Sequence, residues 1–330
     1  MRIFVVGIGL LISFTGFAQL KTAVSDTTRN FSEARLKAHL EVLTSDSLEG
    51  RCTATEGQKK AAAYISSFME EYHLLQVVKD SNGNASWFQS WPFAKRFGDP
   101  KKYLPYSENV IGLLPASVPN NEYIVISGHY DHLGIIRDTI YNGADDNGTG
   151  TASLLELIRL LSMDSIRPRN ILFIFFSGEE KGLLGSKYYS EHPVIPLEEL
   201  YCDINIDMIG RADSAHMADS NYIYVIGSDR ISNDLDQLLR NANARGDSLF
   251  LDYTFNDPED PQRLYERSDH YNFAKHDIPV VFFFSGLHPD YHSFSDDMEK
   301  INLGILYKRM MLAYRLTKEL LVHPGNLQRN

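Results

Sequence analysis

The chain has 330 residues, of which 43% are hydrophobic and 23% charged, a composition ordinary for a globular protein with a substantial core. The 43 acidic and 32 basic side chains give a formal net charge of −11. Binding to nucleic acid requires a basic surface that neutralises phosphates, so this balance argues against nucleic acid as a partner. The length suits one large α/β domain or two small ones.

The first residues have the pattern of an export signal. Arg2 gives a short positive region, residues 3–17 form an apolar run, and Gly16-Phe17-Ala18 is a small-x-small cleavage site. The run is too short for a comfortable transmembrane span, and no later stretch is long enough either. The alternative is a buried N-terminal strand or helix. We therefore expect a signal peptide over residues 1–18 and a mature chain, 19–330, that is periplasmic or extracellular and not inserted in a membrane.

Cys52 and Cys202 are the two cysteines of the chain. Export permits a disulfide, but a single pair so far apart in the sequence is not a disulfide framework. We favour free thiols over a Cys52–Cys202 bridge.

Two kinds of periodicity follow one another along the chain. Apolar residues recur at helical spacing over residues 31–45 and 56–75, whereas 79–106 is rich in turn residues and indicates a loop with a short strand or two. Apolar runs then alternate with helical patterns. Strands are expected at 109–114, 122–127, 170–177, 201–207, 222–226 and 278–284, and helices at 150–162, 182–190, 230–244, 263–275 and about 301–322. Such alternation predicts one three-layer α/β/α sandwich around a mixed, mostly parallel central sheet.

Polar side chains follow four of the predicted strands, at the end where open parallel sheets bind ligands. A loop before the helix at 150–162 adds further carboxylates. These candidates are His129 after the second strand, Glu179 and Glu180 after the third, Asp207 at the end of the fourth, His292 after the last, and Asp145 and Asp146 in the loop.

Each candidate also has an ordinary explanation. Glu179 and Glu180 would be favourable charges at a helix start, Asp145 and Asp146 would form a turn that caps a helix, and the histidines would be solvated loop residues. Their joint placement argues otherwise, because carboxylates crowded at neighbouring strand ends repel unless a cation lies among them. Two imidazoles and three carboxylates suit zinc or a similar ion, and such a mixed set can hold two ions.

The order of the motifs resembles that of the di-zinc exopeptidases of clan MH, which include bacterial leucyl aminopeptidases and glutamate carboxypeptidase II. The resemblance covers about residues 33–304. It rests on HLEVLTSDSLEGR, SENVIGLLP, HYDH, GADDNGTG, FSGEEKGLLGS, NIDMIGR, RSDHYNF and DYHSFSDD, in that order. Members of this group often carry an inserted protease-associated domain, for which this chain has no room, so a single catalytic domain over 19–330 is expected.

The resemblance implies a role for each candidate of the site. It implies two Zn²⁺ per chain, held by two pairs of ligands and a bridging carboxylate: His129 with Asp207, Glu180 with His292, and Asp146 between them. Glu179 would be the general base that takes a proton from the attacking water. Outside the ligands, the Asp131 carboxylate would accept the other ring N–H of His129, and Asp269 would lie near it.

Three further features follow from the resemblance or depart from it. Tyr291 would hydrogen-bond the developing oxyanion, although a packing role for this tyrosine is the equal alternative. The peptide bond between Asp146 and Asn147 would be cis. Asp277 stands where glycine is common in the family, so the backbone after the preceding helix is expected to be strained there.

The activity implied by the resemblance is removal of single residues from peptide substrates, most simply from the amino terminus. Carboxypeptidase and dipeptidase activity, the preferred side chain and the oligomeric state stay open. The first alternative is a glutaminyl cyclase, which uses the same fold with one zinc surrounded by tryptophan. The second is a binding protein that has kept the fold and lost its metals.

Overall fold

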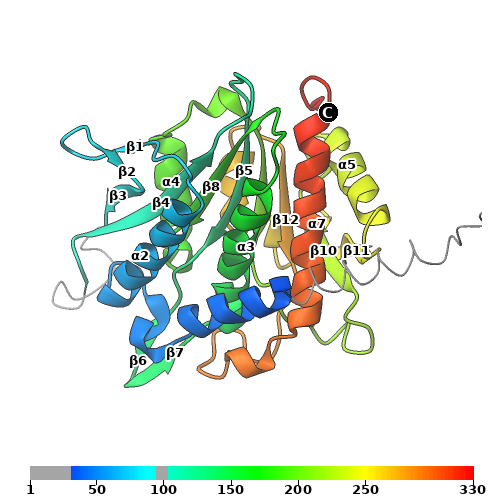
Figure 1. Cartoon of the computed structure of the whole chain (residues 1–330). Coiled ribbons are helices and arrows are strands. Elements are labelled where there is room, and N and C mark those ends of the chain that lie inside the picture. Colours follow the sequence, from blue (N-terminus) through cyan, green and yellow to red (C-terminus); the bar gives the residue numbers. More distant parts are fainter. Residues whose placement is uncertain (1–30, 94–102) are drawn as a thin grey trace, which may run out of the picture.

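The computed structural model describes residues 31–93 and 103–330, and Figure 1 shows a twisted sheet with helices packed against it. The expected signal peptide lies outside the described residues. Within these two ranges, no helix combines the length and the apolar character needed to span a bilayer. The architecture confirms the predicted α/β sandwich.

The central sheet has eight strands in the order β11-β10-β12-β9-β5-β8-β4-β3. Strands β8, β5, β9 and β12 are neighbours and all run parallel, whereas β10, β4 and β3 introduce antiparallel pairs. The sheet is therefore mixed and mostly parallel at its centre. Its strands are β3 (Phe88–Pro92), β4 (Tyr106–Leu114), β5 (Tyr123–His129), β8 (Asn170–Phe176), β9 (Leu200–Ile206), β10 (Tyr222–Ile226), β11 (Phe250–Asp252) and β12 (Val280–Phe284).

Alternation along the central strands sends side chains to two separate cores. On β5, Ile124 and Ile126 pack into the larger core, while Val125 packs into the core on the opposite face. The register pairs Ile124 with Ile171 and Val125 with Leu172 of β8, so neighbouring strands contribute to the same face. Both faces of these strands are buried, which explains why the sequence shows continuous apolar runs here.

Helices cover both faces and complete the three layers. Residues 31–43 and the helices α2 (Glu56–Glu71), α3 (Gly150–Ser162), α5 (Asn233–Ala244) and α7 (Leu303–Val322) pack on the larger core. Figure 1 shows α2, α3 and α7 lying in front of the sheet. The other face is covered by α4 (Leu184–Glu191) and α6 (His270–Ala274).

Two small two-stranded sheets lie outside the central one. They are formed by β1 (Val78–Lys79) with β2 (Ala85–Ser86), and by β6 (Gly134–Ile136) with β7 (Thr139–Tyr141). The second hairpin follows directly after the loop that leaves β5, so it is close in the chain to the candidate site.

The helix predicted at 263–275 is shorter than expected, since only His270–Ala274 is α-helical. Arg263 adopts a left-handed conformation with φ 52°, and the Asp260 side chain accepts a hydrogen bond from the backbone N–H of Leu264. These local interactions hold the first part of the segment as a short 3-10 helix (Leu264–Glu266) and turns, in spite of its helical apolar spacing.

Two smaller expectations are settled by the backbone. Cys52 and Cys202 are both free and buried, as favoured from the sequence. Asp277, after α6, has φ 61°, a left-handed conformation that glycine adopts more readily than aspartate, so the strain expected there is present.

Candidate metal centre

The four parallel strands at the middle of the sheet bring the candidate ligands to one edge. His129 is the last residue of β5, Asp207 follows β9 directly, and Glu180 lies in the turn after β8. His292 comes from the loop after β12, and Asp146 from the turn before α3. The structure therefore brings together all five residues expected to bind metal.

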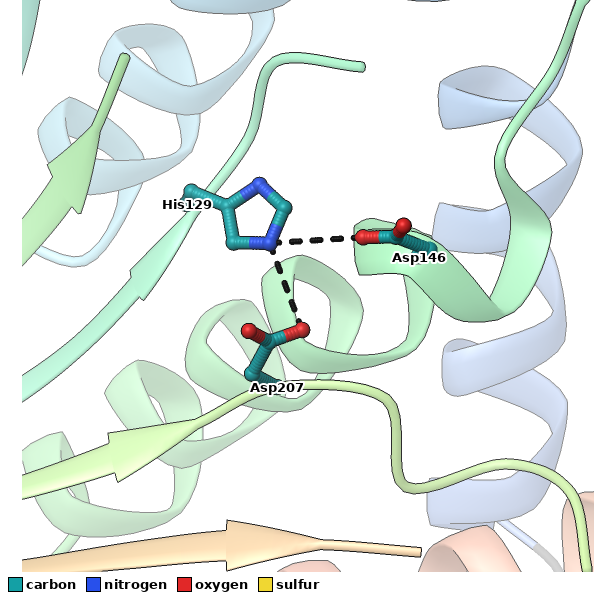
Figure 2. Close-up of side chains that lie close together, drawn as sticks. All are labelled: His129, Asp146 and Asp207. Atoms are coloured by element: carbon teal, nitrogen blue, oxygen red, sulfur yellow. Dashed lines mark ion pairs between the residues drawn. The ribbon is translucent and has the colours of Figure 1, made fainter. Parts of the chain in front are cut away.

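His129, Asp146 and Asp207 form the first group (Figure 2). The Nε2 atom of His129 lies 3.4 Å from Oδ1 of Asp146 and 3.2 Å from Oδ1 of Asp207. The three side chains come from a strand end, a helical turn and the end of a second strand, and they converge on one point. All three residues are buried.

Glu180 and His292 lie on the other side of Asp146. Nε2 of His292 is 3.2 Å from Oδ2 of Asp146 and 3.1 Å from Oε2 of Glu180. Burial opposes protonation of His292, but the two carboxylates outweigh it and raise the pKa of this histidine to about 10. Asp146 thus presents one oxygen to each group, as a bridging ligand would.

The donor atoms fit bound cations. Nε2 of His129, Oδ1 of Asp207 and Oε1 of Glu180 are all buried without a hydrogen-bond partner in the described chain. Buried polar atoms are normally paired, so convergent orphaned ones call for an ion. Ligands 2.0–2.1 Å from a tetrahedral zinc are about 3.3 Å apart. The separations of 3.1–3.4 Å within the two groups match that spacing.

The loop that carries Asp146 is held from several directions. Its peptide bond to Asn147 is cis, as expected from the resemblance. Asp296 accepts the backbone N–H groups of Asp145 and Asp146, at 3.0 and 3.1 Å. The Asp145 carboxylate turns away from the site and accepts the N–H of Gly210 at 2.7 Å. Asp145 is therefore structural, and Asp296 is a supporting residue that sequence reasoning missed.

Two acidic residues lie just outside the ligand groups. The expected contact of Asp131 differs from that found, because Nδ1 of His129 donates to the backbone carbonyl of Asp131 at 3.1 Å, while the carboxylate oxygen is 3.8 Å away. The carboxylate instead accepts the Thr53 hydroxyl. Either contact leaves Nε2 of His129 as the free ring nitrogen. Asp269 is fully buried, and burial raises its pKa to about 7.

Glu179 lies beside the first group. Its Oε2 atom lies 4.0 Å from Nε2 of His129. Burial is the main reason that the pKa of Glu179 is raised well above its usual range, since it outweighs the opposing charge of His129, and the charges of Glu180 and Asp207 add to it. A carboxyl with a raised pKa is suited to accept and return a proton near neutral pH.

Tyr291 packs against the site through its ring. The ring stacks on His292 with centroids 3.9 Å apart, and its hydroxyl lies 3.4 Å from Nη2 of Arg267. Burial and the charges of Asp146 and Glu180 raise the pKa of Tyr291, so its hydroxyl keeps its proton. The structure therefore shows both the packing contact and a hydroxyl that is able to donate.

A hollow opens beside the first group. Tyr291, Asp146, Glu179 and Asp207 line its polar side, with Arg267 at one wall. Its other walls are apolar, and they are formed by Met208, Leu264, Phe282, Phe284 and Leu287. Apolar walls with a few convergent polar groups are typical of a binding site for a small apolar moiety.

His132 is a second residue that sequence reasoning missed. Its side chain is fully buried, and Nδ1 lies 2.8 Å from Oε1 of Glu180 and 3.8 Å from Oδ2 of Asp146. It groups with these two carboxylates as a further candidate ligand. The sequence feature that could have indicated His132 as a ligand is its position three residues after His129, within the same short loop.

Comparison with known proteins was made for both sequence and structure. Residues 109–316 match the model of the family described as "Peptidase family M28". A leucine aminopeptidase 1 of Fusarium vanettenii is 30% identical over 183 residues, which are 53% of this chain and 42% of that protein. Aminopeptidase YwaD of Bacillus subtilis is 36% identical over 107 residues, 32% of this chain and 22% of that protein. The matched part is thus less than half of either relative.

Solved structures agree in fold. The LapA aminopeptidase of Legionella pneumophila has a TM-score of 0.65 at 22% identity. The match covers 91% of this chain and 76% of the LapA chain. The zinc aminopeptidase BSAP of Bacillus subtilis has a TM-score of 0.65 at 19% identity, with coverage of 88% and 95%. A glutaminyl cyclase of Porphyromonas gingivalis has a TM-score of 0.66 at 17% identity, with coverage of 87% and 98%.

Proposed function

Since the chain belongs to peptidase family M28, we propose that it is an exported two-zinc aminopeptidase that removes single residues from the amino terminus of peptides. The mature enzyme is a single catalytic domain over residues 19–330, released from a signal peptide at 1–18 and acting in the periplasm or outside the cell. Peptides are its substrates.

The observation that carries this proposal is the position of Asp146 between two histidines. Its Oδ1 faces His129 and its Oδ2 faces His292, at 3.4 and 3.2 Å. His129 and Asp207 would hold one zinc, Glu180 and His292 would hold the other, and Asp146 would be shared between them. When bound, the zinc ions polarise the scissile carbonyl and make a water molecule more acidic.

The residues of the chain supply proton transfer and orientation. Glu179 takes a proton from the attacking water and returns it to the leaving amine, a task that suits a carboxyl with a raised pKa. The Tyr291 hydroxyl, which keeps its proton, donates a hydrogen bond to the developing oxyanion. Asp131 and Asp269 place further carboxyl groups near His129.

The hollow next to Glu179 receives the side chain of the first residue of the peptide. Its apolar walls favour an aliphatic side chain such as that of leucine or methionine. The names of the two sequence relatives, both aminopeptidases, support amino-terminal rather than carboxy-terminal cleavage.

Glutaminyl cyclase remains the alternative, since one such enzyme shares the fold. Two observations favour the peptidase. The site offers two sets of candidate ligands instead of one, and the hollow beside it has no tryptophan among its described lining residues. Trp87 and Trp91 are instead buried in apolar clusters.

One assay panel tests the proposal. Free peptides and aminoacyl anilides should be hydrolysed, N-acetylated peptides should not, and a chelator should abolish the activity. Cleavage of N-acetylated peptides from their carboxy terminus would make the enzyme a carboxypeptidase. Formation of pyroglutamate from a Gln-x peptide, without release of free amino acid, would decide for the cyclase. No turnover of any of these by the zinc-loaded protein would favour a binding protein.

A further inference from the structure

The imidazole of His132 is the feature that the proposed ligand set leaves unexplained. The side chain is fully buried, and neither of its ring nitrogens has a hydrogen-bond partner in the described chain. A buried polar group without a partner is costly, so an arrangement that keeps one calls for a reason.

The ring nitrogens of His270 and His288 are also buried without a hydrogen-bond partner in the described part of the chain, but His288 faces a single carboxylate, with Nε2 3.3 Å from Oδ2 of Asp145. His39 and His270 have a different environment from that of His132. His39 hydrogen-bonds the Tyr64 hydroxyl at 2.7 Å, and His270 stacks on the Phe282 ring at 4.8 Å between centroids. Burial lowers the pKa of each to about 3, so both are neutral packing residues. His132 instead faces two carboxylates.

The geometry between His132 and Glu180 is not that of a hydrogen bond. Nδ1 of His132 lies only 2.8 Å from Oε1 of Glu180, yet neither atom has a hydrogen-bond partner in the described chain. A hydrogen bond requires the N–H to point at the acceptor, and this pair does not meet that requirement. Two ligands of one ion have the opposite arrangement, since their lone pairs converge on a third point and not on each other. At zinc–ligand distances of 2.0–2.1 Å, such atoms lie roughly 2.9–3.4 Å apart. The observed separation of 2.8 Å is just below this range.

The surrounding backbone fixes the ring in this orientation. Arg51 is fully buried, and it donates hydrogen bonds to the carbonyl oxygens of Tyr130 at 2.9 Å and Gly143 at 3.0 Å. These two carbonyls lie on the loops at either side of His132. The ring packs directly over Gly143, where a Cβ atom would come within 2.4 Å of it. The site for the imidazole is therefore formed before any ligand arrives.

We infer that Nδ1 of His132 is a fourth protein ligand of the zinc ion held by Glu180, His292 and Asp146. This inference rests on the proposed two-zinc function and adds to it. The two positions then differ in kind. The position with His132 has four protein ligands, as closed structural sites do, whereas the position of His129, Asp207 and Asp146 has three and keeps a place for water or substrate. The closed position binds zinc more tightly.

The test measures zinc binding and not only activity. Zinc-free full-length protein is titrated with zinc in competition with a chromophoric chelator, and the zinc-loaded protein is examined by X-ray absorption spectroscopy. The wild type should bind two ions in separate steps and show three imidazoles shared between them. His132→Leu should weaken the tighter step by tenfold or more and remove one imidazole from the spectrum. His39→Leu removes another buried histidine far from the carboxylates, and it should leave both steps unchanged.

Several results would overturn the inference. Two imidazoles in the wild-type spectrum would exclude His132 as a ligand, and this measurement does not depend on whether the variant folds. Unchanged affinities in His132→Leu would do the same. In both cases the two-zinc function would stand. Wild-type protein that takes up no zinc would instead contradict the proposed function, and the inference with it.

Discussion

Glu179 and Glu180 are adjacent in the chain, yet their carboxylates face different histidines. Oε2 of Glu179 lies 4.0 Å from Nε2 of His129, and Oε2 of Glu180 lies 3.1 Å from Nε2 of His292. Both lie in a short 3-10 turn between Gly178 and Gly182, and these two glycines have positive φ values. Since one carboxylate is a ligand in the proposed site and the other is the base, their amide variants should fail in different ways.

We expect Glu179→Gln to keep its zinc and lose turnover. The amide preserves the shape of the side chain but cannot accept a proton, so kcat should fall by about 10²–10⁴ with little change in KM. Glu180→Gln replaces a charged ligand by a neutral one, so it should bind one zinc more weakly and recover part of its activity in excess zinc. Steady-state kinetics and elemental analysis of both variants check this.

The comparison has a clear negative result. If both glutamates only stabilise a helix start, each variant should lose about 0.3–1 kcal/mol of stability and little activity. Near-normal turnover of Glu179→Gln would rule out this residue as the base, whatever its zinc content. Rescue of Glu179→Gln by added zinc would reverse the two assignments.

Removal of zinc should destabilise the protein, and the effect should grow with pH. In the zinc-free protein His292 has a pKa of about 10, above its unfolded value near 6.5, so its stabilising contribution is lost as pH rises between these values. The raised pKa of Glu179 acts in the same direction. Zinc binding strengthens over this range because its ligands must lose their protons. The difference in Tm between the loaded and stripped protein should therefore widen from about pH 6.5 to about pH 9.

Differential scanning calorimetry at several pH values measures this difference directly. Zinc added back should restore Tm at each pH. A difference that is constant with pH, or equal melting curves after confirmed removal of zinc, would contradict a coupling between these groups and the ion.

Leu287 should influence which residue the enzyme removes. It lines the hollow beside Glu179 and is only partly buried, so its truncation enlarges the hollow without a large loss of core packing. Leu287→Ala should lower kcat/KM for leucyl substrates by about 10-fold or more relative to alanyl substrates, since lost apolar contact of this size is worth about 1–3 kcal/mol. Leu75→Ala, at a half-exposed leucine that does not line the hollow, is the control. An equal loss for both substrates would mean that the hollow does not hold this side chain.

Asp203 offers a prediction that does not involve metal. It is fully buried in β9, Oδ1 accepts the Ser127 hydroxyl at 2.7 Å, and burial raises its pKa well above the usual range. An acid whose folded pKa is raised destabilises the fold increasingly as pH rises above its unfolded value. Asp203→Asn should therefore be more stable than the wild type at alkaline pH, with a smaller gain at acid pH. Urea denaturation at two pH values tests this, and a gain independent of pH would contradict it.

The sequence predicted the central sheet well because its strands are buried on both faces. The runs that became β8 and β12 are almost continuously apolar, and those of β5 and β9 carry only a few polar residues, such as Asp203 in β9, which leaves few alternatives. Short strands at the margin, such as β11 (Phe250–Asp252), carry no such signal. The segment before α6 forms only a short 3-10 helix and turns, and not the long helix predicted, because side-chain contacts, such as that of Asp260 with the N–H of Leu264, override its apolar spacing.

The strand order predicted that polar residues after the strands would gather at one edge, and the family resemblance selected the five proposed ligands among them. His132 and Asp296 lie deeper in loops, and nothing in the local pattern tells which way their side chains point. Their positions depend on long-range contacts, such as those of Asp296 with the backbone of Asp145 and Asp146. The contact of His129 with the carbonyl of Asp131, and not with its carboxylate, is likewise a detail of loop conformation.

The order of strands in the sheet has a consequence for biosynthesis. β9 pairs with β12, and the ligands run from His129 to His292, so the site is incomplete until most of the chain has emerged from the ribosome. Domains fold as their sequence becomes available, and a nascent chain that lacks β12 also lacks His292. The ion-binding edge therefore closes last. Under the proposed function, this order would keep the peptidase inert during translation, and a chain exported in the unfolded state would first gain its activity on the far side of the membrane.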